Sequence, residues 1–140
     1  MASPKERRKA REYALQMLYQ WEGERGDPAA VPHGFWRDWQ VAPAVRAYAD
    51  QLFAGAVAAH EEIDQLIAAQ AEHWRLERMA AVDRNLLRLA VYEMRSDPKT
   101  SAAVFINEAL EVARRFSSAE SVTFINGVLD AVRKSLEAQR

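Results

Sequence analysis

The sequence predicts an all-helical protein. Residues that favour helices, chiefly alanine, leucine, glutamate, arginine and glutamine, recur along the 140 residues, whereas glycine and proline number only five each. Apolar residues recur at three- and four-residue spacing, as on one face of a helix, and no segment shows a credible strand pattern. We therefore expect six or seven helices in a single domain spanning residues 1–140, which is long enough to bury a core without disulfides or metals.

The first helix has clear signals at both ends. Ser3 and Glu6 have the spacing of a capping box, and Pro4 suits the first helical position. The helix should end near Gly23, because residues 23–34 hold three glycines and two prolines and are expected to form a loop. The apolar stripe of this helix consists of Ala10, Ala14, Met17 and Trp21.

The middle of the chain predicts two more helical segments. Phe35, Trp36 and Trp39 are spaced to form one short apolar helix face that anchors to the core. Pro43 then opens a long helix that we expect to continue to residue 69 or 71, followed by a break near residues 72–75.

The C-terminal part predicts three further helices. The first should stop before Asp97, because the residue before a proline disfavours helical geometry. The second covers residues 101–116, and the third begins at a second capping box formed by Ser117 and Glu120. Gly127 lies inside the last helix, where it costs about 1 kcal/mol relative to alanine, so we expect another helix to approach it closely.

Several classes of function lack the residues that they need. There is no cysteine, no glycine-rich phosphate loop, and no histidine with a partner spaced for metal binding. His60 with Asp64 is read as a surface pair, and Glu108 with Glu111 as a solvated helix face. We therefore expect a protein that is not an enzyme and has no metal or cofactor.

The sequence also gives an expectation about location. No run of about 18 apolar residues could span a membrane, and the basic start is not followed by the apolar stretch of a signal peptide. The absence of cysteine suits a reducing compartment. We expect a cytoplasmic protein without a membrane partner.

The main positive signal is the basic start of the first helix. Residues 1–11 carry a charge of +4, against −1 for the whole chain, so the remaining 129 residues carry −5. Cations are unfavourable at a helix N-terminus, whereas phosphates are favoured there, and arginine also offers a flat face for stacking on bases. The alternative is a simple solubility feature. The five cations are Lys5, Arg7, Arg8, Lys9 and Arg11.

These cations lead to a first expectation about RNA. We expect the arginines to pack little, so that replacing Arg7, Arg8 and Arg11 by alanine weakens RNA binding and leaves the fold intact. The nearby Tyr13 and Tyr19 are interpreted as core or partner contacts.

An acidic cluster surrounds a later helix start. Glu72, Glu77 and Asp83 either stabilise that helix N-terminus or face a basic partner. Direct contact of these acids with phosphate would be repulsive, which favours a protein partner over RNA at this position.

Four motifs in order resemble the NusB antitermination family. Residues 7–21 (RRKAREYALQMLYQW) resemble the opening helix of that family, and residues 86–94 (LLRLAVYEM) resemble its central helix. Residues 104–116 (VFINEALEVARRF) are similar to its Ile-Asn-Glu-Ala helix, and residues 124–130 (FINGVLD) to its C-terminal signature. The order and spacing fit nearly the whole chain.

The resemblance implies both a fold and a function. It implies an all-helical fold of about seven helices in two small bundles. It also implies binding to the boxA element of nascent RNA together with NusE, a ribosomal protein of the small subunit. That complex joins other Nus factors on RNA polymerase and suppresses termination during ribosomal RNA synthesis. A homodimer is possible.

The resemblance also assigns residues by position. Arg7, Arg8, Lys9 and Arg11, with Lys5 beside them, match the arginine-rich RNA-binding start. Glu120 and Phe124 match positions beside that RNA surface, whereas Tyr19 and Asp83 match positions on the NusE side. The chain departs from the family in having Thr123 where a basic residue is frequent, and serines at 117 and 118 where one glycine is frequent.

Two other functions fit the same helical pattern. The sequence also resembles the N-terminal extension of a ribosomal RNA cytosine methyltransferase, where the domain would be an accessory RNA-binding module. Since this sequence carries no catalytic domain after the last helix and no cysteine nucleophile, a free-standing factor is preferred. The remaining alternative is a helical protein-interaction domain without RNA affinity.

Overall fold

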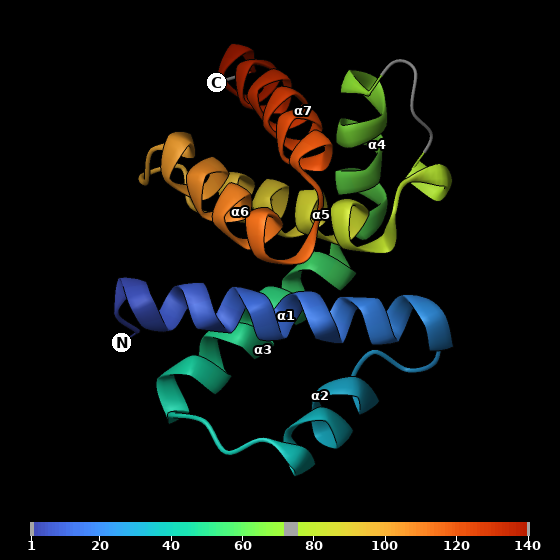
Figure 1. Cartoon of the computed structure of the whole chain (residues 1–140), viewed down its shortest axis with the longest axis vertical. Helices are drawn as coiled ribbons and strands as arrows, with labels where there is room; N and C mark the ends of the chain where they lie inside the picture. Colours follow the sequence, from blue (N-terminus) through green and yellow to red (C-terminus); the bar gives the residue numbers. More distant parts are fainter. Residues whose placement is uncertain (1, 72–75, 140) are drawn as a thin grey trace.

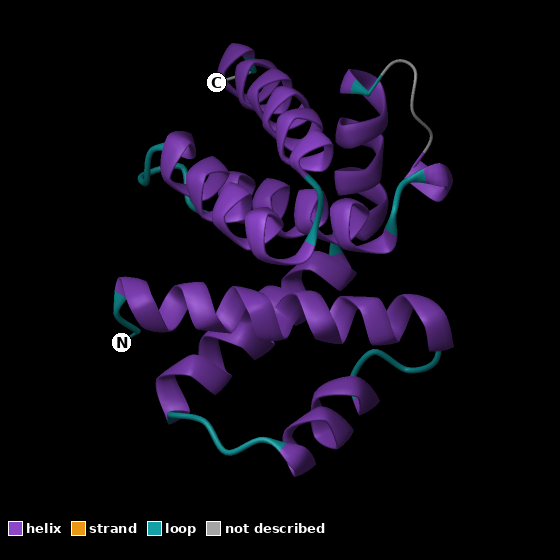
Figure 2. Ribbon diagram, viewed as in Figure 1, coloured by secondary structure: helices purple, strands orange, loops and turns teal. Residues whose placement is uncertain are grey.

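The computed structural model describes residues 2–71 and 76–139, and within these residues it contains seven α-helices and no strand, as Figure 2 shows. The all-helical prediction is confirmed. Two short 3₁₀ turns, Trp36–Asp38 and Leu76–Arg78, interrupt the series. The helices are α1 (Pro4–Glu24), α2 (Ala30–Phe35), α3 (Pro43–Ala58), α4 (His60–Gln70), α5 (Ala81–Ser96), α6 (Ala102–Phe116) and α7 (Ala119–Ala138).

Helix α1 begins and ends as local signals predict. The Glu6 amide donates to Ser3 Oγ at 3.1 Å, and the Ser3 amide donates to Glu6 Oε1 at 3.0 Å, which completes the predicted capping box. The helix ends at Glu24, where Arg25 takes a left-handed conformation with φ of 53° and its amide donates to the Trp21 carbonyl. This cap satisfies one of the last helical carbonyls.

The segment predicted as a loop contains a helix. Helix α2 starts at Ala30, after a turn in which the Ala29 amide donates to Asp27 Oδ1 at 3.0 Å. Pro32 lies in the first turn of α2, where a missing amide proton costs little. Glycine and proline counts alone therefore overestimated the length of the loop.

The aromatic residues that follow anchor to α1 but do not share one helix. Phe35 ends α2, Trp36 lies in the 3₁₀ turn, and Trp39 follows it. The rings of Phe35, Trp36 and Trp39 all meet the ring of Tyr13 edge-on, with centroids 5.3–6.0 Å apart. Trp36 Nε1 also donates to Asp50 Oδ1 at 2.7 Å, which ties this segment to α3.

The long helix predicted from Pro43 is divided at Ala59 into α3 and α4. Helix α3 packs mainly against α1, whereas α4 packs against α5 and α7. Figure 1 shows the resulting arrangement: α1 runs across the middle, α2 lies on one side and α4 to α7 on the other, and α3 crosses behind α1 toward α5. A straight helix could not reach both sets of partners, and this requirement is not visible in its apolar pattern.

The last three helices follow the prediction except at one cap and one glycine. Helix α5 ends at Ser96, before Asp97 as expected. The predicted capping box at Ser117 is wrong, because the side chain of Ser118 caps α7 by accepting from the Ser121 amide at 3.1 Å. No atom lies within 4 Å of a Cβ built on Gly127, so the expected close approach there is wrong as well.

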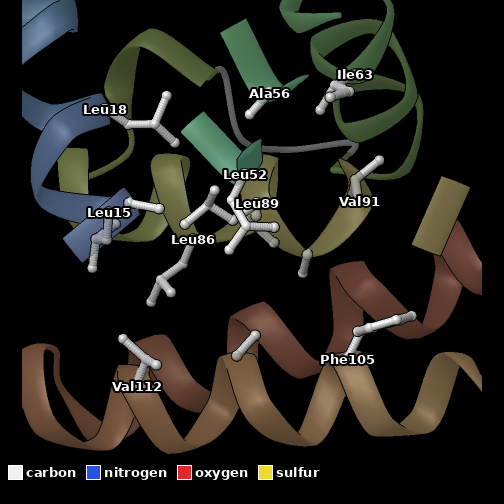
Figure 3. Packing of buried hydrophobic residues seen from close by; sticks show 14 of the residues in the cluster. Leu15, Leu18, Leu52, Ala56, Ile63, Leu86, Leu89, Val91, Phe105 and Val112 are labelled. Carbon is white, nitrogen blue, oxygen red and sulfur yellow. The ribbon is translucent and has the colours of Figure 1, made fainter. Parts of the chain in front are cut away.

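A close approach does occur at another glycine. A Cβ built on Gly55 would overlap the ring of Tyr92, so α3 and α5 meet closely at this point. The apolar core is continuous across these contacts: Figure 3 shows side chains of α1, α3, α4, α5 and α6 directed into one interior, among them Leu18, Leu52 and Leu86. Helix α1 is thus packed from both sides, and its orientation is fixed by the core.

Candidate nucleic-acid interface

The five predicted cations of α1 differ greatly in exposure. Lys5, Arg8 and Lys9 are exposed, Arg7 is half-buried, and Arg11 is buried. They share the first two turns of one helix, but the helix presents them to different neighbours. The basic start is therefore only partly a solvent-facing surface.

Arg8 forms a two-pronged ion pair with Glu108 of α6. Its Nε and Nη2 donate to Glu108 Oε2 and Oε1 at 2.8 and 2.9 Å, although the Arg8 side chain stays 53% exposed. The hydrogen bonds from Arg8 lower the pKa of Glu108 below its ordinary value, and the same bonds raise the pKa of Arg8. The interpretation of Glu108 as a solvated carboxylate is wrong.

Arg11 lies in the interior between α1 and α5. Its Nε and Nη2 donate to Glu93 Oε1 and Oε2 at 2.7 and 2.9 Å, and the two side chains are 7% and 5% exposed. The Tyr48 hydroxyl donates to Glu93 Oε2 at 2.6 Å. Burial, together with the Glu93 carboxylate, raises the pKa of Tyr48 well above its usual range. The expectation that Arg11 packs little is wrong, because an acid on α5 meets it inside the protein.

Two further cations of α1, Arg7 and Lys9, contact aromatic rings. The Arg7 guanidinium lies over the Tyr48 ring, 5.5 Å from its centroid, and its Nε is buried without a hydrogen-bond partner in the described part of the chain. Lys9 Nζ lies 5.3 Å from the centroid of the Tyr13 ring. Both cations therefore rest on aromatic surface beside the interior of the protein.

Lys9 also belongs to a small charged cluster between α1 and α6. Its Nζ lies 3.4 Å from Glu12 Oε2, and the buried Glu12 also accepts a hydrogen bond from Arg115 of α6. Arg115 is largely exposed, so α6 adds a cation to the face that α1 begins.

Asp83, Glu120 and Phe124 come together at the start of α7, just beyond the C-terminal end of α6. They line a hollow of about 190 Å³ with Arg78 among its other walls. Glu120 is exposed, whereas Asp83 is buried and accepts hydrogen bonds from the Ser117 and Ser121 hydroxyls, each at 2.7 Å. The carboxylate of Asp83 therefore connects the start of α5 to the α6–α7 junction. Glu77 is exposed, and Glu72 lies outside the described residues.

Tyr19 lies apart from that hollow, in an apolar groove on α1. The groove encloses about 380 Å³, and its lining includes Phe35 from α2, Val82 from α5 and Phe116 from α6. The Tyr19 side chain is 60% exposed, and the ring of Phe116 is exposed as well. The groove continues along α1 to Glu12, so it reaches the cluster that contains Lys9.

The sequence comparisons identify the family. The model of the NusB family matches residues 8–134. The chain belongs to the NusB family. A relative from Koribacter versatilis (strain Ellin345), named transcription antitermination protein NusB, is 54% identical over 135 residues, covering 96% of this chain and 92% of the relative. A NusB of the same name from Solibacter usitatus (strain Ellin6076) is 46% identical, covering 93% and 90%.

Solved structures of NusB proteins have the same fold. T. maritima NusB is 32% identical with a TM-score of 0.82, covering 96% of this chain and 93% of that one. A crystal structure described as antitermination factors NusB and NusE in complex with dsRNA gives a TM-score of 0.82 at 26% identity, covering 95% and 99%.

Sequence reasoning missed the acids that organise this NusB-family face. Glu12, Glu93 and Glu108 lie on three helices and engage the cations of α1. Apolar residues lie three or four positions from Glu12 and from Glu108, on the same face of each helix. This spacing is the one local sign that the two acids face inward. Apart from Lys9, which precedes Glu12 by three residues, their partners lie about 80–100 residues away in sequence, so no local pattern could pair them.

A second charge network, largely removed from solvent, joins α1, α4 and α5. Asp64 accepts two hydrogen bonds from Arg88 at 2.8 and 2.9 Å, and Arg88 also donates to Glu22, as does Arg84. The expected surface pair of His60 and Asp64 is therefore wrong. Burial alone would raise the pKa of Glu22, but the hydrogen bonds from Arg84 and Arg88 outweigh it and lower this pKa.

Neither a metal site nor a membrane span is found in the part of the chain that the structure describes. Within residues 2–71 and 76–139, no group of three histidine or acidic side chains could hold a metal ion. Over the same residues, none of the helices combines the length and apolar character that crossing a membrane requires.

Proposed function

We propose that this NusB-family chain is a transcription antitermination factor that binds boxA RNA together with NusE during ribosomal RNA synthesis. The observation that carries the proposal is the exposed cationic start of α1, where Lys5, Arg8 and Lys9 reach solvent. It stands in a chain 54% identical to a protein named for antitermination. A neighbour with a TM-score of 0.82 was solved with NusE and RNA, which supports both partners.

RNA would lie across the start of α1 and the neighbouring part of α6. Lys5, Arg8 and Lys9 supply accessible cations for phosphates, and Arg7 supplies a guanidinium held over an aromatic ring. The buried Arg11 acts from behind by fixing α1 against α5.

Glu120 and Phe124 form a second part of the proposed RNA surface. They border the hollow at the start of α7, where an aromatic ring can meet an unstacked base. Glu120 is an anion, so it would limit how closely a phosphate approaches there.

NusE would occupy the apolar groove at Tyr19. An exposed aromatic ring beside apolar walls is typical of the central part of a protein interface. Asp83 would serve this side indirectly, by holding the α6–α7 junction in place. A second copy of the chain, bound over the same groove in a homodimer, is the competing occupant. Sedimentation of the chain alone tests for this dimer.

The complex would act without catalysis and would reach RNA polymerase through other Nus factors. Because its target is a nascent transcript on RNA polymerase, we place its action in the cytoplasm.

A titration with labelled boxA RNA tests the proposal. RNA is titrated with the chain alone and with NusE, at two salt concentrations. The triple variant Lys5→Ala, Arg8→Ala and Lys9→Ala should bind less tightly, and its salt slope should shrink by about 2, at roughly 0.7 for each of three lost phosphate contacts. Lys134→Ala on α7, whose cation pairs with Asp130, is the matched control and should bind like the wild type.

A second variant separates the partners. Tyr19→Ala should weaken binding only in the presence of NusE, because the groove does not contain the exposed cations of α1. Equal RNA affinity of the triple variant and the wild type would show that RNA binds elsewhere on the molecule.

A further inference from the structure

The proposed RNA face carries its own anion. Glu108 meets the guanidinium of Arg8 through both of its oxygens, at 2.8 and 2.9 Å. A phosphate recognises an arginine through the same pair of parallel hydrogen bonds. A phosphate that approached the Nε and Nη2 edge of Arg8 would therefore have to displace this carboxylate.

The structure offers Glu108 a second cation. Arg11 Nη1 lies 3.6 Å from Glu108 Oε2, and Arg11 uses its other nitrogens, Nε and Nη2, to bind Glu93. Glu108 can therefore release Arg8 and remain paired with Arg11. The Glu108 carboxylate therefore keeps a cation throughout the exchange. An unpaired, partly buried carboxylate would oppose the exchange strongly.

The exposure of the two partners fits this exchange. Arg8 is more than half exposed and stands on a flexible stem, so it can turn toward solvent, whereas Arg11 is fixed in the interior. The mobile cation is thus the one that RNA can reach.

We propose that Glu108 is a built-in competitor of RNA, which holds Arg8 in the free protein and passes to Arg11 when a phosphate takes its place. The inference rests on the proposed function, because it concerns the same cationic face. It implies that the chain binds RNA less tightly than its exposed charge would allow, and that NusE has to supply part of the affinity.

The test is Glu108→Gln in the full chain, titrated with boxA RNA with and without NusE. An exposed ion pair of this kind is weak, so RNA affinity should rise by about two- to five-fold at low salt. The salt slope should stay close to that of the wild type, because Arg8 meets a phosphate in both proteins and the variant removes only the cost of displacing Glu108.

The matched control is Glu111→Gln. Glu111 lies one turn further along α6 and pairs with Arg114 of the same helix, at 2.5 Å, instead of with α1. This variant changes the net charge by the same amount without freeing Arg8. Its affinity for RNA should stay close to that of the wild type.

A double variant separates competition from a structural effect. In an Arg8→Ala background, Glu108→Gln should no longer tighten binding, because the competed cation is absent. If Glu108→Gln fails to fold, Glu108→Asp carries the test, since its shorter side chain cannot pair with Arg8 in the same two-pronged way.

Two results would overturn the inference. One is wild-type affinity in the folded Glu108 variant, and the other is a gain that persists without Arg8 or appears equally in Glu111→Gln. In both cases the wild type still binds RNA with NusE, so the proposed function stands. Failure of the wild type itself to bind RNA with NusE would instead refute the proposed function.

Discussion

Replacing Arg11 by alanine should destabilise the fold by about 3–5 kcal/mol, the usual result of removing one partner from a buried ion pair. Both members of the pair are at least nine-tenths buried, and Arg11 donates two hydrogen bonds to Glu93. The variant leaves the Glu93 carboxylate in the interior with the Tyr48 hydroxyl as its remaining donor among the hydrogen bonds found. One hydroxyl cannot replace a guanidinium as partner of a buried anion.

Urea unfolding followed by far-ultraviolet circular dichroism at pH 7 measures this change. With a denaturant slope of about 1–3 kcal/mol per molar, the midpoint should fall by at least about 1 M. Arg8→Ala is the matched control, because Arg8 also forms a two-pronged ion pair but remains exposed, and its midpoint should hardly move. A loss below about 1 kcal/mol in Arg11→Ala would refute the argument that this buried pair fixes α1.

Substitutions at three further positions, Gly55, Gly127 and Glu22, should change the stability of the fold. Gly55→Ala should destabilise the protein by about 1–3 kcal/mol, because its Cβ would overlap the Tyr92 ring. Gly127→Ala should instead stabilise the protein by about 1 kcal/mol. Thermal melts of the two variants measure both changes, and equal shifts in melting temperature would contradict the packing argument. Glu22, whose pKa is lowered in the fold, contributes stability that is present above the ordinary value near 4.3 and is lost as the pH falls through its folded pKa. Glu22→Gln should therefore be less stable than the wild type at pH 7, and the difference in stability should become smaller at pH 3. Urea midpoints of both proteins at the two pH values measure this difference. A difference that does not depend on pH would rule out this source of stability.

Helix ends were predictable wherever the signal was local. The capping box at Ser3 and the stop before Asp97 need only their immediate neighbours, and both predictions are confirmed. At the start of α7 two adjacent serines competed for the same role. Ser118 caps the helix because the hydroxyl of Ser117 is engaged by Asp83 of α5, a partner that local spacing does not reveal.

The candidate site was less predictable than the fold for the same reason. Charge along the chain correctly located a cluster of cations, but it treated Arg8 and Arg11 as equivalent. Their difference depends on which face of α1 meets α5 and α6, and therefore on acids far away in sequence. The division of one long helix at Ala59 likewise depends on what each half packs against.

The pairing of Arg11 with Glu93 also has a consequence for synthesis on the ribosome. The two residues are 82 positions apart, so at 5–20 residues per second α1 is made about 4–16 s before its partner on α5. During that interval α1 can already pack against α3, which is made earlier, but Arg11 is without the Glu93 carboxylate that will pair with it. Helices α5, α6 and α7 are consecutive neighbours in contact, and such local contacts form fastest. The nascent chain can therefore dock α1 on α3 before α5 is made, but the side of α1 that carries Arg11 stays uncovered until the last three helices emerge.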